Sequence, residues 1–139
     1  MNTWIMAFDY GNVRIGIAIA NTQLKIPHPI TTVTGRNNLE KLTKISKLIE
    51  EWSPSLLVIG MPPLDNIDQI QKQLLIKNIN KFTNRLKAKF KLPVTLINED
   101  YTSQIASEQL QTQNLYGKAQ ALKIDSLAAC LILQFFFNQ

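Results

Sequence analysis

The sequence contains very little cysteine, histidine or glycine. Of its 139 residues, one is cysteine, one is histidine and five are glycine. The single cysteine, Cys130, excludes a disulfide framework or a cysteine-based zinc site within one chain. It lies in the apolar run SLAACLIL, which is typical of a buried, unreactive thiol. The lone histidine, His28, stands between two prolines and would be a weak metal ligand, so we assign it no catalytic role.

The chain also lacks a long apolar run. No segment approaches the roughly 18 uninterrupted apolar residues that a membrane span requires. The N-terminal MNTWIMAFDY has neither a basic region nor a cleavage site. These absences predict a soluble, cytoplasmic protein with no membrane partner. A chain of 139 residues with 45% hydrophobic content has room for one good core, so we expect a single domain over residues 1–139.

Acidic residues are in the minority. Ten Asp and Glu stand against 15 Lys and Arg, which gives a formal net charge of +5. This excess suits a polyanionic partner without requiring one. It is concentrated between residues 72 and 91, where seven basic residues, including Lys81 and Arg85, occur without an acidic one. Such a stretch either follows a nucleic-acid backbone or is simply a solvated helix face, and the composition leaves both interpretations open.

Apolar patterning predicts an α/β domain with a mixed sheet. We expect strands over Trp4–Phe8, Val13–Ala20, Ile30–Thr34, Leu56–Ile59 and Pro93–Ile97. We expect helices from a cap at Asn37-Asn38 to Ser53-Pro54, and over Ile67–Phe90, Thr102–Gln113 and Ala119–Phe136. The first two strands are close enough along the chain to form a hairpin, and the prolines before the third strand favour a place near the sheet edge.

Three carboxylates occur where solvation or helix capping does not readily explain them. Asp9 follows the first apolar run, Glu99 follows the run PVTLI, and Asp125 lies inside the apolar helix KIDSLAACLIL. If the first and last strands are parallel, Asp9 and Glu99 emerge at one edge of the sheet, where α/β proteins place ligand sites. A final helix crossing that edge would bring Asp125 beside them. Crowded carboxylates must take up protons or bind a cation, and oxygen-only ligands favour Mg²⁺ or Mn²⁺.

Each of these residues, taken alone, also has a simpler interpretation. Asp9 is followed by Tyr10-Gly11-Asn12, a turn signal, so Asp9 is also a candidate turn residue. In the simpler interpretation of Asp125, its side chain faces solvent or a lysine such as Lys123. Arg14, on the predicted second strand, would contact either a phosphate or only water. The metal-site interpretation depends on the agreement among the three acidic positions.

Several motifs carry a resemblance to a known family. In chain order they are FDYGNVRIGIA, VIGMP, FTNRLKAKFKLPV, INEDYTSQIA and KIDSLAACLIL, and together they extend over almost the whole chain. Their order and content resemble the YqgF/RuvX family. The resemblance implies an RNase H-like fold, a five-stranded mixed sheet flanked by helices. It also implies a divalent-metal nuclease assigned to maturation of the 5′ end of pre-16S ribosomal RNA, in a family earlier taken for Holliday junction resolvases.

By motif position, the resemblance implies that Asp9, Glu99 and Asp125 are the catalytic residues and hold Mg²⁺ or Mn²⁺. The positions of Asp9 and Glu99 after apolar runs and of Asp125 inside an apolar helix point to the same three residues. We expect nucleic-acid contacts from Arg14, Lys81, Arg85, Lys118 and Lys123. The chain departs from the family pattern around Glu99, where Asn98-Glu99-Asp100 replaces the usual Asp-Glu-Arg. The acidic Asp100 therefore occupies the position where the family has a basic arginine.

The leading hypothesis is a metal-dependent endonuclease acting on structured RNA, an rRNA precursor within ribosomal precursor particles. A Holliday junction resolvase acting on branched DNA would use the same chemistry, and the chain would be a monomer or a homodimer. A non-catalytic module that binds nucleic acid or the ribosome is a third hypothesis, supported by the altered motif around Glu99. Half of an actin-like ATPase also begins with Asp-x-Gly, but that fold needs two such domains, and 139 residues are too few.

Overall fold

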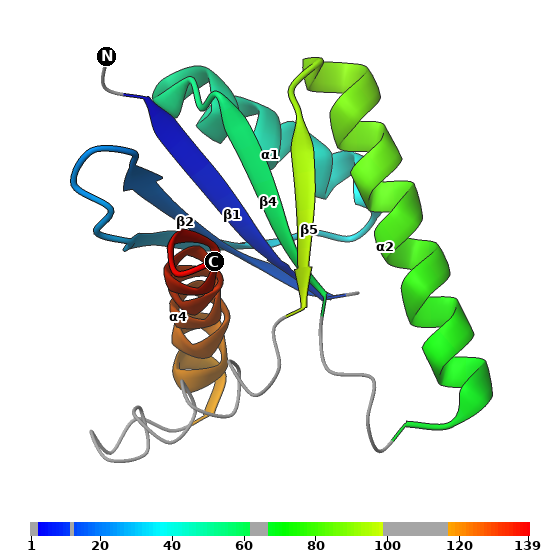
Figure 1. Cartoon of the computed structure of the whole chain (residues 1–139). Coiled ribbons are helices and arrows are strands. Elements are labelled where there is room, and N and C mark those ends of the chain that lie inside the picture. Colours follow the sequence, from blue (N-terminus) through cyan, green and yellow to red (C-terminus); the bar gives the residue numbers. More distant parts are fainter. Residues whose placement is uncertain (1–2, 12, 62–66, 99–116) are drawn as a thin grey trace.

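The computed structural model describes residues 3–11, 13–61, 67–98 and 117–139, and in 117–124 it describes the backbone alone. These residues form a five-stranded mixed sheet with helices on both faces (Figure 1). In chain order the elements are β1 (Trp4–Tyr10), β2 (Arg14–Asn21), β3 (His28–Thr34), α1 (Asn38–Trp52), β4 (Leu56–Met61), α2 (Gln69–Phe90), β5 (Val94–Asn98) and α4 (Gly117–Phe137).

The strands lie in the order β3-β2-β1-β4-β5. β1 and β2 form an antiparallel hairpin, and β3 pairs antiparallel with β2 at one edge of the sheet. β4 pairs in parallel with β1, and β5 pairs in parallel with β4 at the other edge. β1, β4 and β5 therefore end at the same edge (Figure 1). The predicted fold class, the hairpin and the edge position of β3 are confirmed.

β1 is longer than the sequence predicts. The strand was expected to stop at Phe8, but it continues through Asp9 and Tyr10. Asp9 pairs with Gly16 on β2 and with Gly60 on β4. The alternative of a turn at Asp9 is therefore wrong, because pairing with strands on both sides extends the ladder past the apolar run and outweighs the turn signal that follows.

The other described elements lie within two residues of their predicted bounds. β3 begins at His28 rather than Ile30, because an edge strand tolerates Pro29. α4 begins at Gly117, two residues before the predicted start. The helix predicted over 102–113 lies outside the described residues.

The two faces of the sheet carry side chains of different size. β2 reads RIGIAIAN, so its isoleucines point to one face and its glycine and alanines to the other. On the isoleucine face, α1 and α2 cover a core of large side chains that includes Met6, Phe8, Ile45, Ile79 and Leu86. On the other face, α4 packs its Ala129 and Ile132 on Ala7, Ala18 and Ala20. Small side chains on this face allow the helix backbone to come close to the strands.

α4 comes into backbone contact with the sheet at Gly16. A Cβ atom at position 16 would overlap the backbone carbonyl of Asp125 and would lie 2.8 Å from the backbone nitrogen of Ser126. No other amino acid fits at this position without moving the helix. Gly16 therefore sets the distance between α4 and β2.

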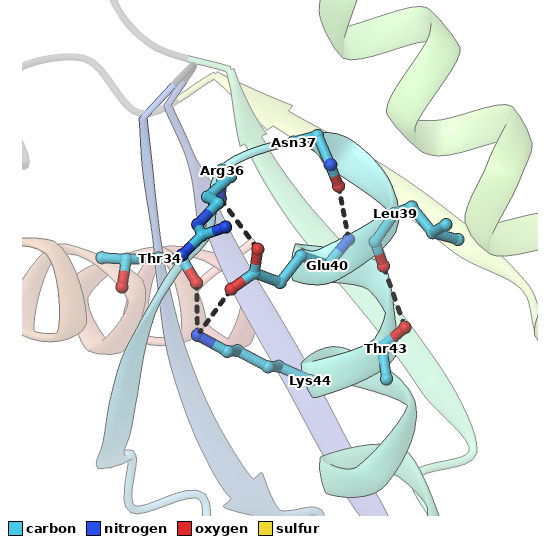
Figure 2. A network of polar contacts seen from close by, with 7 residues as sticks. All are labelled: Thr34, Arg36, Asn37, Leu39, Glu40, Thr43 and Lys44. Carbon is cyan, nitrogen blue, oxygen red and sulfur yellow. Dashed lines mark hydrogen bonds and ion pairs between the residues drawn. The ribbon is translucent and has the colours of Figure 1, made fainter.

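A polar network fixes the junction between β3 and α1 (Figure 2). The Asn37 side chain accepts a hydrogen bond from the Glu40 backbone N–H at 2.8 Å, and the Glu40 carboxylate accepts one from the Arg36 N–H at 3.1 Å. Lys44 donates to the carbonyl of Thr34 at 2.7 Å and pairs with Glu40. An Asn cap followed three residues later by Glu is a sequence signature of a helix start. The predicted cap at Asn37 is confirmed.

The described side chains of α4 are largely apolar, and this environment surrounds Cys130. The thiol is free and 8% exposed. Burial raises the pKa of Cys130 to about 11, so almost no reactive thiolate is present at neutral pH. The expectation of a buried, unreactive thiol is confirmed. Within the part of the chain that the structure describes, no helix has both the length and the apolar character needed to cross a bilayer.

The contact at Gly16 makes a prediction about stability. Gly16→Ala should lower the free energy of unfolding by about 2 kcal/mol or more, because the added methyl group forces α4 away from β2. Urea denaturation followed by circular dichroism measures the loss. Gly35→Ala is the control, because the two atoms nearest to its new Cβ, Cγ and the backbone nitrogen of Lys41, lie 3.1 and 3.2 Å away and need to shift only slightly, so it should cost less. Equal stability of Gly16→Ala and the wild type would contradict this account of the α4 contact.

Candidate functional site

The candidate site is centred on Asp9, near the carboxyl end of β1. Strand alternation places Asp9 on the same face as Ile5 and Ala7, the face that α4 covers. Its partners in the neighbouring strands, Gly16 and Gly60, have no side chains. Asp9 is 7% exposed. An acidic side chain is thus held between two glycines in a nearly buried position, where an ionised carboxylate requires polar or cationic compensation.

Asp125 approaches the same place from α4. Its backbone lies against Gly16, the direct partner of Asp9 in the hairpin. Its carboxylate Oδ2 accepts a hydrogen bond from Arg14 Nε at 2.7 Å, and the two side chains form an ion pair. The Asp125 side chain is 17% exposed. The fold therefore brings together, on one face of the sheet, two of the three predicted carboxylates.

The Arg14–Asp125 ion pair is a contact that the sequence analysis missed. Asp125 was expected to face a metal ion, solvent or Lys123, and its described partner instead comes from 111 residues away. A local signal exists, because Arg14 stands two residues before Gly16 on the face that the glycine opens to α4. The pair uses Oδ2 of Asp125, and 41% of the Arg14 side chain is exposed. A nucleic-acid contact by Arg14 stays a prediction.

Glu99, the third predicted carboxylate, lies outside the described residues. β5 ends at Asn98, directly before it. One residue earlier, Ile97 pairs with Gly60, which in turn pairs with Asp9. Asp9, Gly60 and Ile97 thus form one row across the sheet, next to the point where the described part of β5 ends. The convergence of Glu99 on Asp9 stays a prediction.

The predicted nucleic-acid contacts do not all share this site. Lys81 and Arg85 lie on α2, which packs on the opposite face of the sheet from the carboxylates. The side chains of Lys118 and Lys123 are not among those described. Five basic residues are predicted to contact nucleic acid. Among those whose side chains the structure describes, Arg14 is the one that lies beside Asp125.

The donor atoms of the site fit a hard divalent cation. Asp9 and Asp125 provide carboxylate oxygens, which suit Mg²⁺ or Mn²⁺ better than softer metals. Arg14 holds one oxygen of Asp125, and outer-shell hydrogen bonds of this kind orient carboxylates that bind metals. Among the described residues, no three His, Cys, Asp or Glu side chains form a metal-binding group. Glu99, the predicted third ligand, lies outside those residues, so a three-carboxylate site stays a prediction.

The chain matches a family profile described as RuvX, Holliday junction resolvase, over residues 3–139. Curated relatives align over most of their length. A protein of Nitrosospira multiformis is 40% identical over 134 residues, which are 96% of this chain and 87% of the relative. A protein of Chromobacterium violaceum is 41% identical over 135 residues, which are 96% of each chain. Both are named "Putative pre-16S rRNA nuclease".

Solved structures share the fold at low sequence identity. Thermus thermophilus RuvC in complex with a Holliday junction substrate matches with a TM-score of 0.59 and 11% identity, over 98% of this chain and 95% of that one. The yeast mitochondrial Holliday junction resolvase Ydc2 matches with a TM-score of 0.50 and 13% identity, over 93% and 75%. These likenesses confirm the RNase H-like fold that the sequence predicts. The profile match and the curated relatives establish that the chain belongs to the RuvX (YqgF) family.

Proposed function

We propose that this chain is a metal-dependent endonuclease of the cytoplasm that cleaves structured RNA and matures the 5′ end of pre-16S rRNA. The observation that carries the proposal is the position of Asp125, whose backbone lies on Gly16 next to Asp9. Asp9 and Asp125 come from opposite ends of the chain, yet both lie on the α4 face of the sheet. Packing of an apolar helix on a sheet does not require two acidic residues there. The names of the curated relatives support RNA as the substrate.

Asp9, Asp125 and Glu99 are the proposed ligands of Mg²⁺ or Mn²⁺. A cation bound there supplies a Lewis acid that polarises the phosphodiester and lowers the pKa of a water molecule. The chain itself supplies the arrangement of the ligands. β1 and α4 hold Asp9 and Asp125 on one face of the sheet, where both residues would provide carboxylate oxygens to a bound cation. Arg14 keeps the Asp125 carboxylate in one orientation through Oδ2.

A resolvase of branched DNA is the second candidate function. It is favoured by the fold likeness to RuvC in complex with a Holliday junction substrate. A two-fold symmetric junction requires two active sites, so this function predicts a homodimer. Cleavage of a four-way DNA junction and of a 5′-extended rRNA precursor, at equal concentrations, would distinguish the two functions. The molecular mass in solution provides an independent comparison.

The carboxylates provide the direct test of the proposed activity. Asp9→Asn and Asp125→Asn should each slow Mn²⁺-dependent cleavage of a 5′-extended rRNA precursor by at least about 100-fold, because losing a ligand costs more than the 10–100-fold typical of an outer-shell partner. Binding of the same RNA should be retained. Glu51→Gln, on the exposed surface of α1, removes the same charge elsewhere and should have no effect.

Two outcomes would contradict this mechanism. Cleavage without a divalent cation would show that the carboxylates have another role. Unchanged cleavage by Asp125→Asn would favour a contaminating nuclease or the non-catalytic module that the Asn98-Glu99-Asp100 motif suggests.

The ion pair at Asp125 makes a separate prediction for Arg14. If Arg14 positions Asp125, Arg14→Gln should raise the Mn²⁺ concentration that gives half-maximal cleavage by about 10–100-fold and leave metal-free RNA affinity unchanged. Arg14→Lys should recover only part of the activity, because an ammonium lacks the planar geometry of the guanidinium. A fall in RNA affinity with an unchanged metal requirement would instead identify Arg14 as a phosphate contact. Metal titrations of cleavage, together with RNA binding in EDTA, separate the two roles.

A further inference from the structure

A polar pocket lies on the face of the sheet opposite the carboxylates. α1, α2 and the adjoining ends of β1 and β2 form its walls. Its polar lining residues are Tyr10, Asn38, Lys41, Asn78, Lys81 and Arg85. The space open to the centre of a water-sized sphere is about 30 Å³, which is room for a group of a few atoms. We call it the Tyr10 pocket.

Three cationic side chains line the Tyr10 pocket, and none of its described lining residues is acidic. Lys41 comes from α1, whereas Lys81 and Arg85 are spaced one turn apart on α2. The acidic residue nearest in sequence to Lys41 is Glu40. Its carboxylate is directed to the network with Arg36 and Lys44 (Figure 2). The pocket thus has three positive charges in its lining, one on the buried Lys41 and two on the exposed Lys81 and Arg85.

Lys41 is built into the interior of the protein. It is 6% exposed and lies on the helix stripe that also carries the buried Ile45 and Ile49. Gly35 makes room for it, since a Cβ there would lie 3.1 Å from Lys41 Cγ. A lysine held this deeply requires polar or charged partners. An anion in the pocket would interact favourably with the charges of Lys41, Lys81 and Arg85 together.

Uncharged donors complete the lining. Burial raises the pKa of Tyr10, and the positive charge of Arg85 opposes this shift, so we expect the hydroxyl to be a donor at neutral pH. Asn38 and Asn78 add carboxamide N–H groups. Hydroxyl, amide, ammonium and guanidinium donors around one small space match the tetrahedral set of oxygens of a phosphate group.

We propose that the Tyr10 pocket binds a single phosphate group, separately from the site at Asp9 and Asp125. The charge of a phosphate, together with its several acceptor oxygens, suits three cations and three uncharged donors better than a carboxylate does. The phosphate belongs either to an RNA strand or to a small phosphorylated molecule, and both present the same chemistry. The proposal does not depend on cleavage by the carboxylates.

Titration of the full chain tests the proposal. Inorganic phosphate and then AMP are added to ¹⁵N-labelled protein, and backbone amide shifts are compared with those caused by chloride at equal ionic strength. Saturable shifts should be confined to the Tyr10 pocket. Lys81→Gln and Arg85→Gln should each weaken binding by about tenfold or more, the loss expected for one charged hydrogen bond. Lys77→Gln and Lys87→Gln remove the same charge from exposed positions of α2 outside the pocket and should leave binding unchanged.

The absence of saturable shifts beyond the chloride reference would overturn the proposal, as would equal weakening by Lys87→Gln. A short RNA added to Asp9→Asn protein identifies the source of the phosphate. Competition between RNA and inorganic phosphate, with both weakened by Arg85→Gln, supports a strand phosphate in the pocket. Simultaneous binding without competition supports a small phosphorylated molecule. Intact phosphate binding in a chain that cleaves no RNA would reject the proposed nuclease function and leave this inference standing.

Discussion

The backbone contact between α4 and Gly16 is the constraint on which the candidate site depends. Because position 16 has no side chain, the carbonyl of Asp125 occupies the space that a Cβ would take. Gly16 pairs directly with Asp9, so the same contact that seats the helix also brings the two acidic residues to one place. A helix held further away would break the 2.7 Å contact between Arg14 and Asp125. The absence of a side chain at position 16 therefore determines both how α4 packs on β2 and how Asp125 is placed for the proposed chemistry.

The difference in side-chain size between the faces explains why each face has its own kind of site. On the α4 face, alanines and glycines let the helix backbone touch the strands, which leaves little space and places Asp125 next to the pair of Asp9 and Gly16. On the other face, α2 rests on large rings. Phe82 lies 5.8 Å from Phe8 and 5.0 Å from Tyr10, measured between ring centroids. Spacers of this size hold the helices away from the sheet, and the Tyr10 pocket forms at the end of the strands.

The sequence predicts features that have local causes. Strand alternation identifies the sheet, and the Asn37 cap identifies the start of α1. The acidic positions stand out because Asp9 follows an apolar run and Asp125 lies inside an apolar helix. Long-range features escape such reasoning. Gly16, two residues after Arg14, marks a face open to close packing, but it does not identify a partner 111 residues away, because that pairing exists only once α4 lies on β2. Lys41 falls on the apolar stripe of α1, so its burial can be expected from the sequence. The residues that surround its side chain cannot be predicted in this way, because some of them come from α2.

Asp9 and Tyr10 are consecutive residues of β1, so they point to opposite faces and link the two sites by a single peptide unit. Asp9 is paired with β2 on one side and β4 on the other, which fixes its backbone within the centre of the sheet. A ligand pressing on Tyr10 therefore cannot move Asp9 without disturbing three strands. This rigidity argues against a switch that transmits ligand binding through β1. It favours two sites held at a constant separation, with the spacing set by the thickness of the sheet.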